Sequence, residues 1–558
     1  MESVVIRVQS TLGNNKKKKT LLLTKNMSNN KPMNVFRAKA KHWNLAVDSA
    51  EFAMRLDQED PFGTYRHQFI FPKKSDLPYV DKKRLFDDNE EALYLCGQSL
   101  GLEPKTCKKN VKEVLKNWGE KGVHSHFHGY MPAALSDLVP KTLMARIVGA
   151  KPNEVALMNA LTVNLHLLLS TFYRPSQRRH KIIIEEHAFS SDMFVVKSQI
   201  RFHGLSPDNS LIMLKTRPGE HLLREEDILE VIEKEGDNVM VAMLPAVQYY
   251  TGQLLNVQRL TKAAQNKGIV VGVDLAHAVG NVPIYLDKWN VDFAAWCTYK
   301  YLCSGAGGIG GIYVNEQYTE NGGSATFPML QGWWGNSIKT KFLMKDDFDP
   351  SIGADMFKLS NPSPVLNAML MASLDIYNQT SVEELKEKQF LLTGYLEYMI
   401  KSYFPRKRTS KTRHPSNDNN NLSGGMPSVE IITPADPDQR GAQLSLIFSV
   451  PLTPVQEELQ KRGVVCDIRM PSVMRVAPVP IYNSFTDVHK FVSILYEIFE
   501  GFDIEKRLYD NCGEEDLFTE WHGDDNLSMS SSNSSACPSP TTVSDSDCDS
   551  FNGSLNVL

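Results

Sequence analysis

No apolar run in the 558-residue sequence reaches the ~18 residues that a membrane-spanning helix requires, so we expect no membrane span. An excess of positive charge is missing as well. The formal net charge is −4, from 61 Lys and Arg against 65 Asp and Glu. A nucleic-acid-binding domain would show a strongly basic face. We therefore expect neither a membrane nor a nucleic acid as a partner.

Paired cysteine motifs are also missing. The eight cysteines include no CxxC pair, and no apolar segment typical of a secretory signal follows Met1. Both features favour reduced thiols in the cytosol, so we expect a cytoplasmic protein. The basic run at residues 16–19 leaves a mitochondrial transit peptide open, although the arginines and the amphipathic pattern of such peptides are missing.

Residues that build a core are scarce in three stretches. Residues 1–35 are polar and rich in Asn and Lys. No Lys or Arg follows Arg507, and Asp, Ser and Asn accumulate to the end of the chain. This composition predicts disorder in residues 1–35 and 506–558. The polar stretch 406–425 predicts a flexible surface loop.

The rest of the chain alternates between short apolar runs and helical periodicity. Strands are predicted at 155–158, 181–185, 211–214, 239–244, 269–273 and 293–296, with helices of ten or more residues between most of them. Such βαβ units predict an α/β fold with a mostly parallel sheet. Further helices are predicted at 40–56, 106–118, 139–148, 362–381 and 382–404.

After the loop the pattern changes to a small α+β domain. It has strands at 428–432, 443–448 and 474–477, and helices at 454–462 and 486–499. We therefore predict a large domain at 105–370 and a small domain at 371–505. An N-terminal segment at 36–104 is expected to pack on the small domain.

An acid and a lysine follow two of the predicted strands. Asp274 ends the run 269–273, with His277 three residues later, and the run 293–296 leads into Tyr299 and Lys300. Ligands of open α/β sheets lie outside the carboxyl ends of the strands. Pyridoxal phosphate (PLP) requires a lysine that binds it covalently and a carboxylate facing its ring nitrogen. The pattern therefore suggests a PLP site.

Simpler interpretations exist for each feature. A lysine after a strand is usually a solvated loop residue, and an aspartate there is often a helix cap or a turn residue. Gly305, Gly307 and Gly310 match G-x-G-x-x-G, but the apolar residues 312–314 after them predict a strand. A dinucleotide-binding loop must open a helix, so we reject that interpretation.

Three alternating histidines, His124, His126 and His128, raise the question of a metal. Alternation along a strand would place them on one face. No cysteine or carboxylate joins them at ligand spacing, so we predict no metal site.

Six motifs in sequence order resemble the kynureninase family, from about residue 45 to about residue 503. They are ALMNALTVNLHLLL (156–169), VDLAHAVGN (273–281), WCTYKYL (296–302), GWWG (332–335), SNP (360–362) and RVAPVPIYNSF (475–485). The resemblance implies a homodimeric, PLP-dependent hydrolase of the aspartate-aminotransferase fold (fold type I). It also implies cleavage of L-kynurenine or 3-hydroxykynurenine to anthranilate or 3-hydroxyanthranilate plus alanine, in tryptophan catabolism and NAD biosynthesis.

The resemblance also implies roles around the cofactor. Lys300 matches the lysine that holds PLP and moves the Cα proton, and Asp274 matches the partner of the ring nitrogen. Tyr299 and Trp333 match phosphate contacts, with Trp333 expected from the partner subunit, and Tyr299 is also a candidate base together with Lys300. His277 matches a residue beside the cofactor.

Other cofactor contacts are implied nearby. Leu161 and Thr162 begin a helix whose free backbone N–H groups favour a phosphate. Phe189 matches the aromatic residue that stacks on the ring, and Asp192 is a polar contact beside it. Pro245 stands where relatives carry a small polar residue, which puts cofactor affinity in doubt.

Four positions are implied on the substrate side. Arg475 matches the arginine that forks onto the substrate carboxylate. Asn361, which also lies near the cofactor, His126 and Ser99 match positions near the aryl end. Ser99 lies in a tight turn at residues 97–102, in which Gln98 replaces the Asn usual in the family. The sequence of residues 128–133 also differs from that of relatives.

Two rival functions stay open at this point. A cysteine desulfurase or aminotransferase would share the fold, but a desulfurase needs a nucleophilic cysteine on a loop. A scaffold without activity would have no need for Lys300, Asp274 and Arg475 together.

Overall fold

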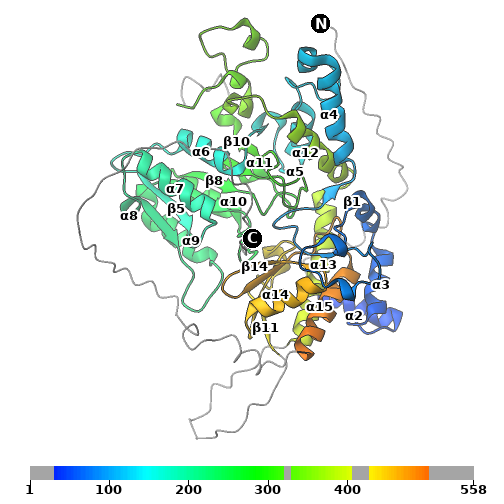
Figure 1. Ribbon diagram of the computed structural model, residues 1–558. Coiled ribbons are helices and arrows are strands. Elements are labelled where there is room, and N and C mark those ends of the chain that lie inside the picture. Colours follow the sequence, from blue (N-terminus) through cyan, green and yellow to red (C-terminus); the bar gives the residue numbers. More distant parts are fainter. Residues whose placement is uncertain (1–30, 320–327, 405–426, 502–558) are drawn as a thin grey trace, which may run out of the picture. The chain divides into compact units, whose positions relative to one another are not determined.

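The computed structural model describes residues 31–319, 328–404 and 427–501 (Figure 1). The chain divides into two units, 1–498 and 499–558, and the features below belong to the first apart from the last two residues of α15. The loop expected at 406–425, the tail expected at 506–558 and residues 1–30 lie outside the described residues. Helix α2 begins at Pro32, so residues 32–35 are helical and not disordered. No helix in the described ranges is long and apolar enough to span a membrane.

A seven-stranded sheet forms the centre of the molecule and confirms the expected α/β fold. Strand β10 runs antiparallel to both of its neighbours, and the other neighbouring pairs are parallel. In spatial order the strands are β4 (Val155–Leu157), β10 (Gly311–Val314), β9 (Phe293–Trp296), β8 (Val270–Asp274), β7 (Val239–Pro245), β5 (Lys181–Glu185) and β6 (Leu211–Leu214).

Helices cover both faces of this sheet. Ile183 packs in one buried cluster, whereas its neighbours Ile182 and Ile184 pack in another, because successive side chains of a strand point to opposite faces. The first cluster includes residues of α5 (Leu138–Ile147), α9 (Glu225–Glu235) and α10 (Val257–Asn266). The second includes residues of α6 (Leu161–Phe172) and α7 (Ser190–Phe202). Burial on both faces explains why the strands are continuous apolar runs.

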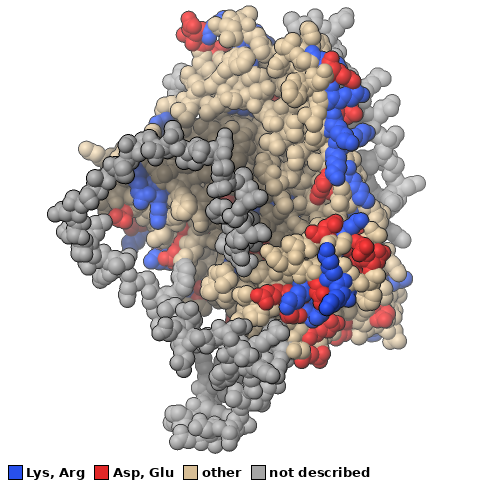
Figure 2. All heavy atoms as spheres, viewed as in Figure 1, with Lys and Arg blue, Asp and Glu red and all other residues tan. Residues whose placement is uncertain are grey.

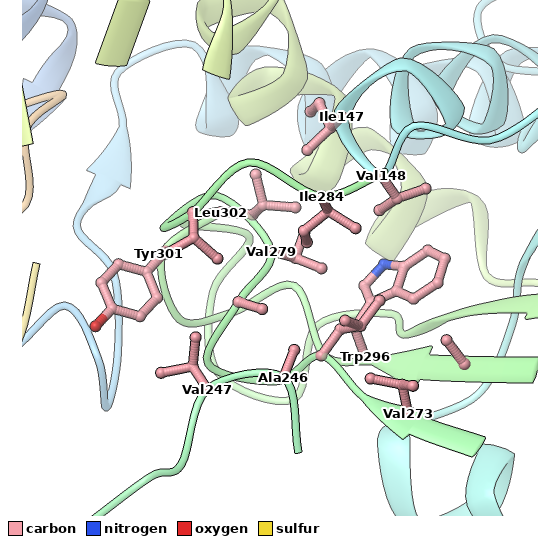
Figure 3. Close-up of a cluster of buried hydrophobic side chains, with 14 of the residues drawn as sticks. Ile147, Val148, Ala246, Val247, Val273, Val279, Ile284, Trp296, Tyr301 and Leu302 are labelled. Atoms are coloured by element: carbon pink, nitrogen blue, oxygen red, sulfur yellow. The ribbon is translucent and has the colours of Figure 1, made fainter. Parts of the chain in front are cut away.

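The first cluster continues under the segment that carries the acid and the lysine. Figure 3 shows the fully buried Trp296, at the end of β9, among Val148, Val273 and Ile284. Large buried side chains of this kind fix the strand end in place. Tyr299 and Lys300, which follow β9, are therefore attached to a strand end that packing holds in place.

The helix predicted at 40–56 is wrong in one respect, because two helices replace it: α2 (Pro32–Trp43) and α3 (Ala50–Glu59). Asn44, in the left-handed conformation with φ 55°, ends the first. The Ser49 hydroxyl accepts a hydrogen bond from Phe52 N (3.1 Å) and begins the second. Further helices are α4 (Cys107–Lys121), α8 (Pro207–Ser210), α11 (Leu286–Trp289), α12 (Pro364–Tyr377) and α13 (Val382–Tyr403).

A smaller antiparallel sheet follows in the C-terminal part. Its order is β11 (Val429–Ile431), β12 (Leu444–Phe448), β15 (Val473–Val476) and β14 (Asp467–Arg469), with helices α14 (Leu452–Lys461) and α15 (Phe485–Glu500). Strand β14 was not predicted. Neither were β1 (Phe69–Ile70), β3 (Glu103–Pro104) and β13 (Val464–Val465), which pairs in parallel with β2 (Leu93–Tyr94). The domain boundaries at 104, 370 and 505 stay predictions.

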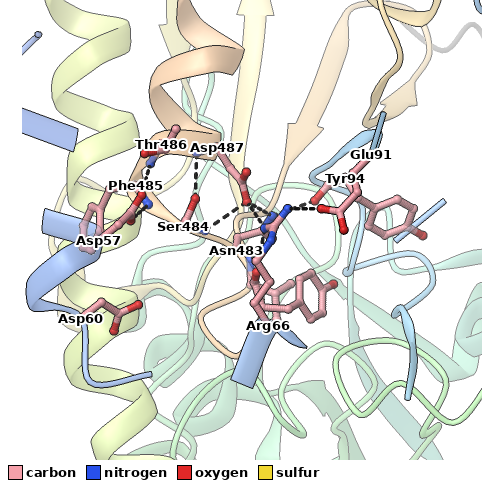
Figure 4. Close-up of polar contacts among 12 residues, drawn as sticks. Asp57, Asp60, Arg66, Glu91, Tyr94, Asn483, Ser484, Phe485, Thr486 and Asp487 are labelled. Atoms are coloured by element: carbon pink, nitrogen blue, oxygen red, sulfur yellow. Dashed lines mark hydrogen bonds and ion pairs between the residues drawn. The ribbon is translucent and has the colours of Figure 1, made fainter. Parts of the chain in front are cut away.

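The N-terminal segment is bonded to the start of α15 (Figure 4). The Asp57 carboxylate accepts hydrogen bonds from the backbone N–H groups of Phe485 (2.6 Å) and Thr486 (3.0 Å), which caps the helix. Arg66 forms an ion pair with Asp487 (2.7 Å). Segments more than 400 residues apart in sequence thus share one polar network.

Candidate active site

A cavity of about 140 Å³ lies at the carboxyl ends of the parallel strands. The ends of β5, β7 and β8, the starts of α6 and α7 and the residues after β9 form its wall. This is the position at which open α/β sheets bind ligands. The cavity wall includes these residues singled out from the sequence: Leu161, Thr162, Phe189, Asp192, Pro245, Asp274, His277, Tyr299 and Lys300.

The acid and the lysine face this cavity from neighbouring strands. Asp274 is the last residue of β8, lies opposite Pro245 of β7 and accepts a hydrogen bond from Ala276 N (2.8 Å). Burial raises the pKa of Asp274, and the positive charge of Lys300 offsets part of that increase. The Lys300 ammonium lies 5.8 Å from the centre of the Phe189 ring. Because burial makes the Asp274 carboxylate more basic, it would form a strong hydrogen bond with a protonated group of a ligand.

A tight turn positions Lys300. The Thr298 hydroxyl donates to Ile309 O (2.5 Å), and Gly101 N donates to Tyr299 O (2.8 Å). A Cβ atom at Gly101 would lie 2.2 Å from Lys300 O, so only glycine fits there. Gly101 thereby anchors the turn that contains Ser99 to the lysine, although Ser99 itself is not part of the cavity wall.

The start of α6 provides an anion site. Its N-cap residue, Ala160, makes no side-chain capping bond, so no side chain occupies the free N–H groups of the first turn. Thr162 Oγ1 lies 2.5 Å from Ser191 Oγ, a residue of the cavity wall that the sequence analysis missed. Backbone N–H groups and hydroxyls of this kind are suited to a phosphate.

Two buried polar atoms of the cavity wall lack a partner among the described residues. They are Asp192 Oδ1 and His277 Nδ1. Burial raises the pKa of Asp192 and lowers that of His277, so the imidazole is neutral near pH 7. Buried polar atoms are normally hydrogen-bonded, and such a pair indicates a polar ligand. Together with the lysine, the acid and the anion site, they fit PLP.

The sequence analysis missed a third carboxylate and a further aromatic ring of the cavity wall. Glu185, at the end of β5, faces the same cavity, and burial raises its pKa to about 8. Gln248 Nε2 donates to Glu185 Oε1 across 3.5 Å. The Tyr249 ring stands edge-on to Phe189 with 5.3 Å between ring centres, and 41% of Phe189 is exposed. The strand-end rule that singled out Asp274 applies equally to Glu185.

Arg475 lies behind Tyr249 and outside the cavity wall. It is fully buried in β15, and its Nη1 donates to Tyr249 O (2.9 Å). Gln98 Nε2 donates to Arg475 O (3.2 Å). Gln98, which replaces the Asn usual in the family, therefore bonds to the backbone of β15 at Arg475.

The remaining predicted residues lie outside the cavity wall. His126 ends a 3-10 helix (Gly122–His126) and not a strand, so the alternating histidines do not share a strand face. The described residues contain no group of three metal-ligating side chains. His126 O accepts from Ala134 N (3.0 Å), and the Asn361 amide, with its nitrogen toward Ala133, donates to Ala133 O (3.0 Å). Both residues are thus tied to the pair 133–134.

Trp333 is 47% exposed, and its indole N–H donates to Lys341 O (3.0 Å). Its ring lies 5.8 Å from Phe342, which lies 5.2 Å from Phe127. Trp333 therefore belongs to a row of aromatic side chains away from this chain's own cavity.

Comparisons with known proteins agree on one family. Residues 104–417 match the model described as aminotransferase class-V, and residues 419–495 match the kynureninase C-terminal domain. A kynureninase of Nematostella vectensis is 47% identical over 472 residues, 84% of this chain and 98% of that protein. The Homo sapiens kynureninase is 46% identical over 449 residues, 80% of this chain and 93% of that protein.

Solved structures share the fold at low identity. A cysteine desulfurase of Thermococcus onnurineus matches with a TM-score of 0.57 and 17% identity, over 74% of this chain and 95% of that one. A C-DES variant with glycine linked to its PLP cofactor matches with a TM-score of 0.58 and 14% identity, over 73% and 96%.

Proposed function

This chain belongs to the kynureninase family, and we propose that it cleaves the Cβ–Cγ bond of L-kynurenine, 3-hydroxy-L-kynurenine or both. The products are the corresponding anthranilate and L-alanine. It is a PLP-dependent hydrolase acting on C–C bonds. The observation that carries the proposal is the placement of Asp274 and Lys300 at one cavity beside an uncapped helix start.

The proposed cofactor contacts follow from the cavity wall. Lys300 would hold PLP covalently, and Asp274 would keep a proton at its ring nitrogen. The start of α6, with Leu161, Thr162 and Tyr299, would bind the phosphate. Phe189 would cover the ring, with Asp192, His277, Pro245 and Asn361 around it. When bound, PLP supplies an electron sink for the charge released at Cα.

The chain's own groups then perform the proton transfers. Arg475 orients the substrate through its carboxylate, and Ser99, His126 and Asn361 are proposed at the aryl end. Lys300 would remove the Cα proton and would later donate a proton to the three-carbon product as alanine forms. Lys300 or Tyr299 would also activate the water that attacks the γ-carbonyl carbon. Burial, Cys297 and Asp274 raise the pKa of Tyr299, which favours Lys300 as the base and Tyr299 as a hydrogen-bond donor.

A homodimer with shared active sites completes the proposal. Besides the aromatic row at Trp333, exposed apolar side chains occur on α4, α5 and the segment after Trp333, such as Trp118 (66%), Val139 (55%) and Leu343 (63%). In Figure 2 the surface over the segment 328–350, at the top, is mostly uncharged apart from one cluster at its tip. Large exposed apolar patches mark protein interfaces. A second copy on this surface would carry Trp333 toward the partner's cavity.

Family membership also supports a cytoplasmic role in tryptophan catabolism and NAD biosynthesis, which we include in the proposal. The desulfurase alternative has little support. Burial raises the pKa of every described cysteine, Cys303 beside the lysine included, and a nucleophile needs an accessible thiolate.

The test is hydrolysis by the purified protein of kynurenine and 3-hydroxykynurenine, followed through anthranilate fluorescence and the absorbance of the bound cofactor. Lys300→Ala should lose both the covalent cofactor band and activity. Lys288→Ala, at an exposed lysine outside the cavity, should lose neither. A cofactor band without product from either substrate would refute the proposed activity, and the faster substrate would set the preference.

A further inference from the structure

Arg475 shares its ion-pair partner with a second arginine. Asp467 of β14 lies directly opposite Arg475 of β15. Arg469, two residues along β14, projects on the same face as Asp467 because side chains of a strand alternate. Asp467 Oδ1 lies 2.9 Å from Arg475 Nε and 2.8 Å from Arg475 Nη2, and Asp467 Oδ2 lies 3.1 Å from Arg469 Nη2. One carboxylate thus bridges two guanidinium groups.

Burial makes the charges of this triad matter. The side chains of Arg475 and Asp467 are 1% and 4% exposed, and that of Arg469 is 33% exposed. Arg475 with Asp467 alone is a neutral pair, which attracts an anion weakly. Arg469 restores a net charge of one positive unit. In a poorly solvated site that charge is screened little.

The triad also keeps a donor unused. Arg469 Nε is a buried atom that makes no hydrogen bond to the described residues, whereas Arg475 Nη2 is paired with Asp467 Oδ1 (2.8 Å). The positive charge acts on the cavity, because the pKa of His277, lowered mainly by burial, is lowered further by Lys300, Arg475 and Arg469. Tyr249 connects the two places, since its ring lines the cavity and its carbonyl oxygen accepts from Arg475.

Resting on the proposed function, we propose that Arg469 is the charge-balancing partner that lets Arg475, although paired with Asp467, bind the α-carboxylate of an amino-acid substrate. Asp467 orients Arg475, and Arg469 cancels the negative charge that this orientation introduces. The family resemblance gave a role to Arg475 alone. The second arginine becomes visible only through the pairing of β14 with β15.

The experiment is a charge cycle on the holoenzyme. Arg469→Gln should raise KM for kynurenine about tenfold while kcat changes less than about twofold, because the lost attraction acts on substrate binding. Arg469→Lys, which keeps the charge, should stay near wild type. Adding Asp467→Asn to Arg469→Gln should recover most of the lost affinity, because the site returns to one net positive charge. Arg178→Gln, at an exposed arginine, is the matched control.

Two outcomes of the kinetic experiment would overturn the inference. A double variant no better than Arg469→Gln, with both folded by circular dichroism, would mean that Arg469 shapes the site without balancing charge. A kynurenine analogue without the α-carboxylate is the second probe. If Arg469→Gln weakened inhibition by this analogue as much as it weakens kynurenine binding, Arg469 would not act on the carboxylate.

Binding of L-alanine, followed through the cofactor absorbance, applies the same cycle without turnover. A wild-type enzyme that binds L-alanine but does not hydrolyse kynurenine would refute the proposed function and leave the charge cycle measurable. A wild-type enzyme that hydrolyses kynurenine, with L-alanine affinity unchanged in Arg469→Gln, would refute only the charge balance.

Discussion

Tyr299→Phe would distinguish the two roles open to Tyr299 in the proposed reaction. Tyr299 is partly buried near Cys297 and Asp274, and burial, followed by these two neighbours, raises its pKa. Little of the deprotonated form needed for a base exists near pH 7. As a donor to the cofactor phosphate, the hydroxyl would contribute about 1.5–3 kcal/mol, the range for a hydrogen bond to a charged group. That corresponds to about 10- to 150-fold in cofactor affinity.

The assay has two readouts on cofactor-free enzyme. PLP is titrated back while its bound absorbance is followed, and kcat is then measured against pH at saturating PLP. Tyr299→Phe should weaken PLP binding within the stated range and leave kcat and its pH profile close to wild type. Tyr285→Phe, at a tyrosine outside the cavity that bonds Glu383 (2.9 Å), is the control. Unchanged PLP affinity with kcat reduced more than about 100-fold, the scale of a lost general base, would refute the reasoning.

Two further predictions concern stability. The Lys388 ammonium lies 2.8 Å from Asp60 Oδ2, and both side chains are less than 5% exposed. Lys388→Met should therefore lower the free energy of unfolding, measured in urea, by about 3–5 kcal/mol, because it leaves the Asp60 carboxylate buried and unpaired. Adding Asp60→Asn should recover part of this loss, and no recovery would contradict a charge effect. Burial raises the pKa of Glu185 from 4.5 to about 8, so the folded state holds this proton more tightly and loses stability as pH rises between these values. Glu185→Gln should therefore raise the melting temperature of cofactor-free enzyme relative to wild type at about pH 9 but not at about pH 4. A wild type that melts at a higher temperature than Glu185→Gln at about pH 9 would contradict the raised pKa of Glu185.

The sheet was predictable because its strands carry a strong local signal. Residues 182–184 and 293–296 are buried on both faces, so they form unbroken apolar runs that end at polar residues. The position of Asp274 at such an end, followed by Lys300 after the next strand, was enough to predict the ligand edge. This prediction used only the local composition and the rule that ligands of open α/β sheets lie at the carboxyl ends of the strands.

What the sequence did not predict depends on distant pairing. Strands β13 and β14 are two and three residues long, too short for a periodic pattern, and form through their partners. The shared role of Asp467 therefore could not be inferred. The break at Asn44 was hidden because helical periodicity continues across it. The strand-end rule does apply to Glu185, which directly follows the apolar residues 182–184.

The bonds between the N-terminal segment and the start of α15 have a consequence during synthesis on the ribosome. Asn483 Nδ2 donates to Tyr94 O (3.0 Å) across 389 residues of sequence. At roughly 5–20 residues per second, elongation needs roughly 20–80 s to make the second partner after the first. For that interval the nascent N-terminal segment lacks its partners and leaves side chains such as Phe69 without their final cover. Slower translation lengthens this exposure, and a chaperone that binds the emerging N-terminal segment would shorten it.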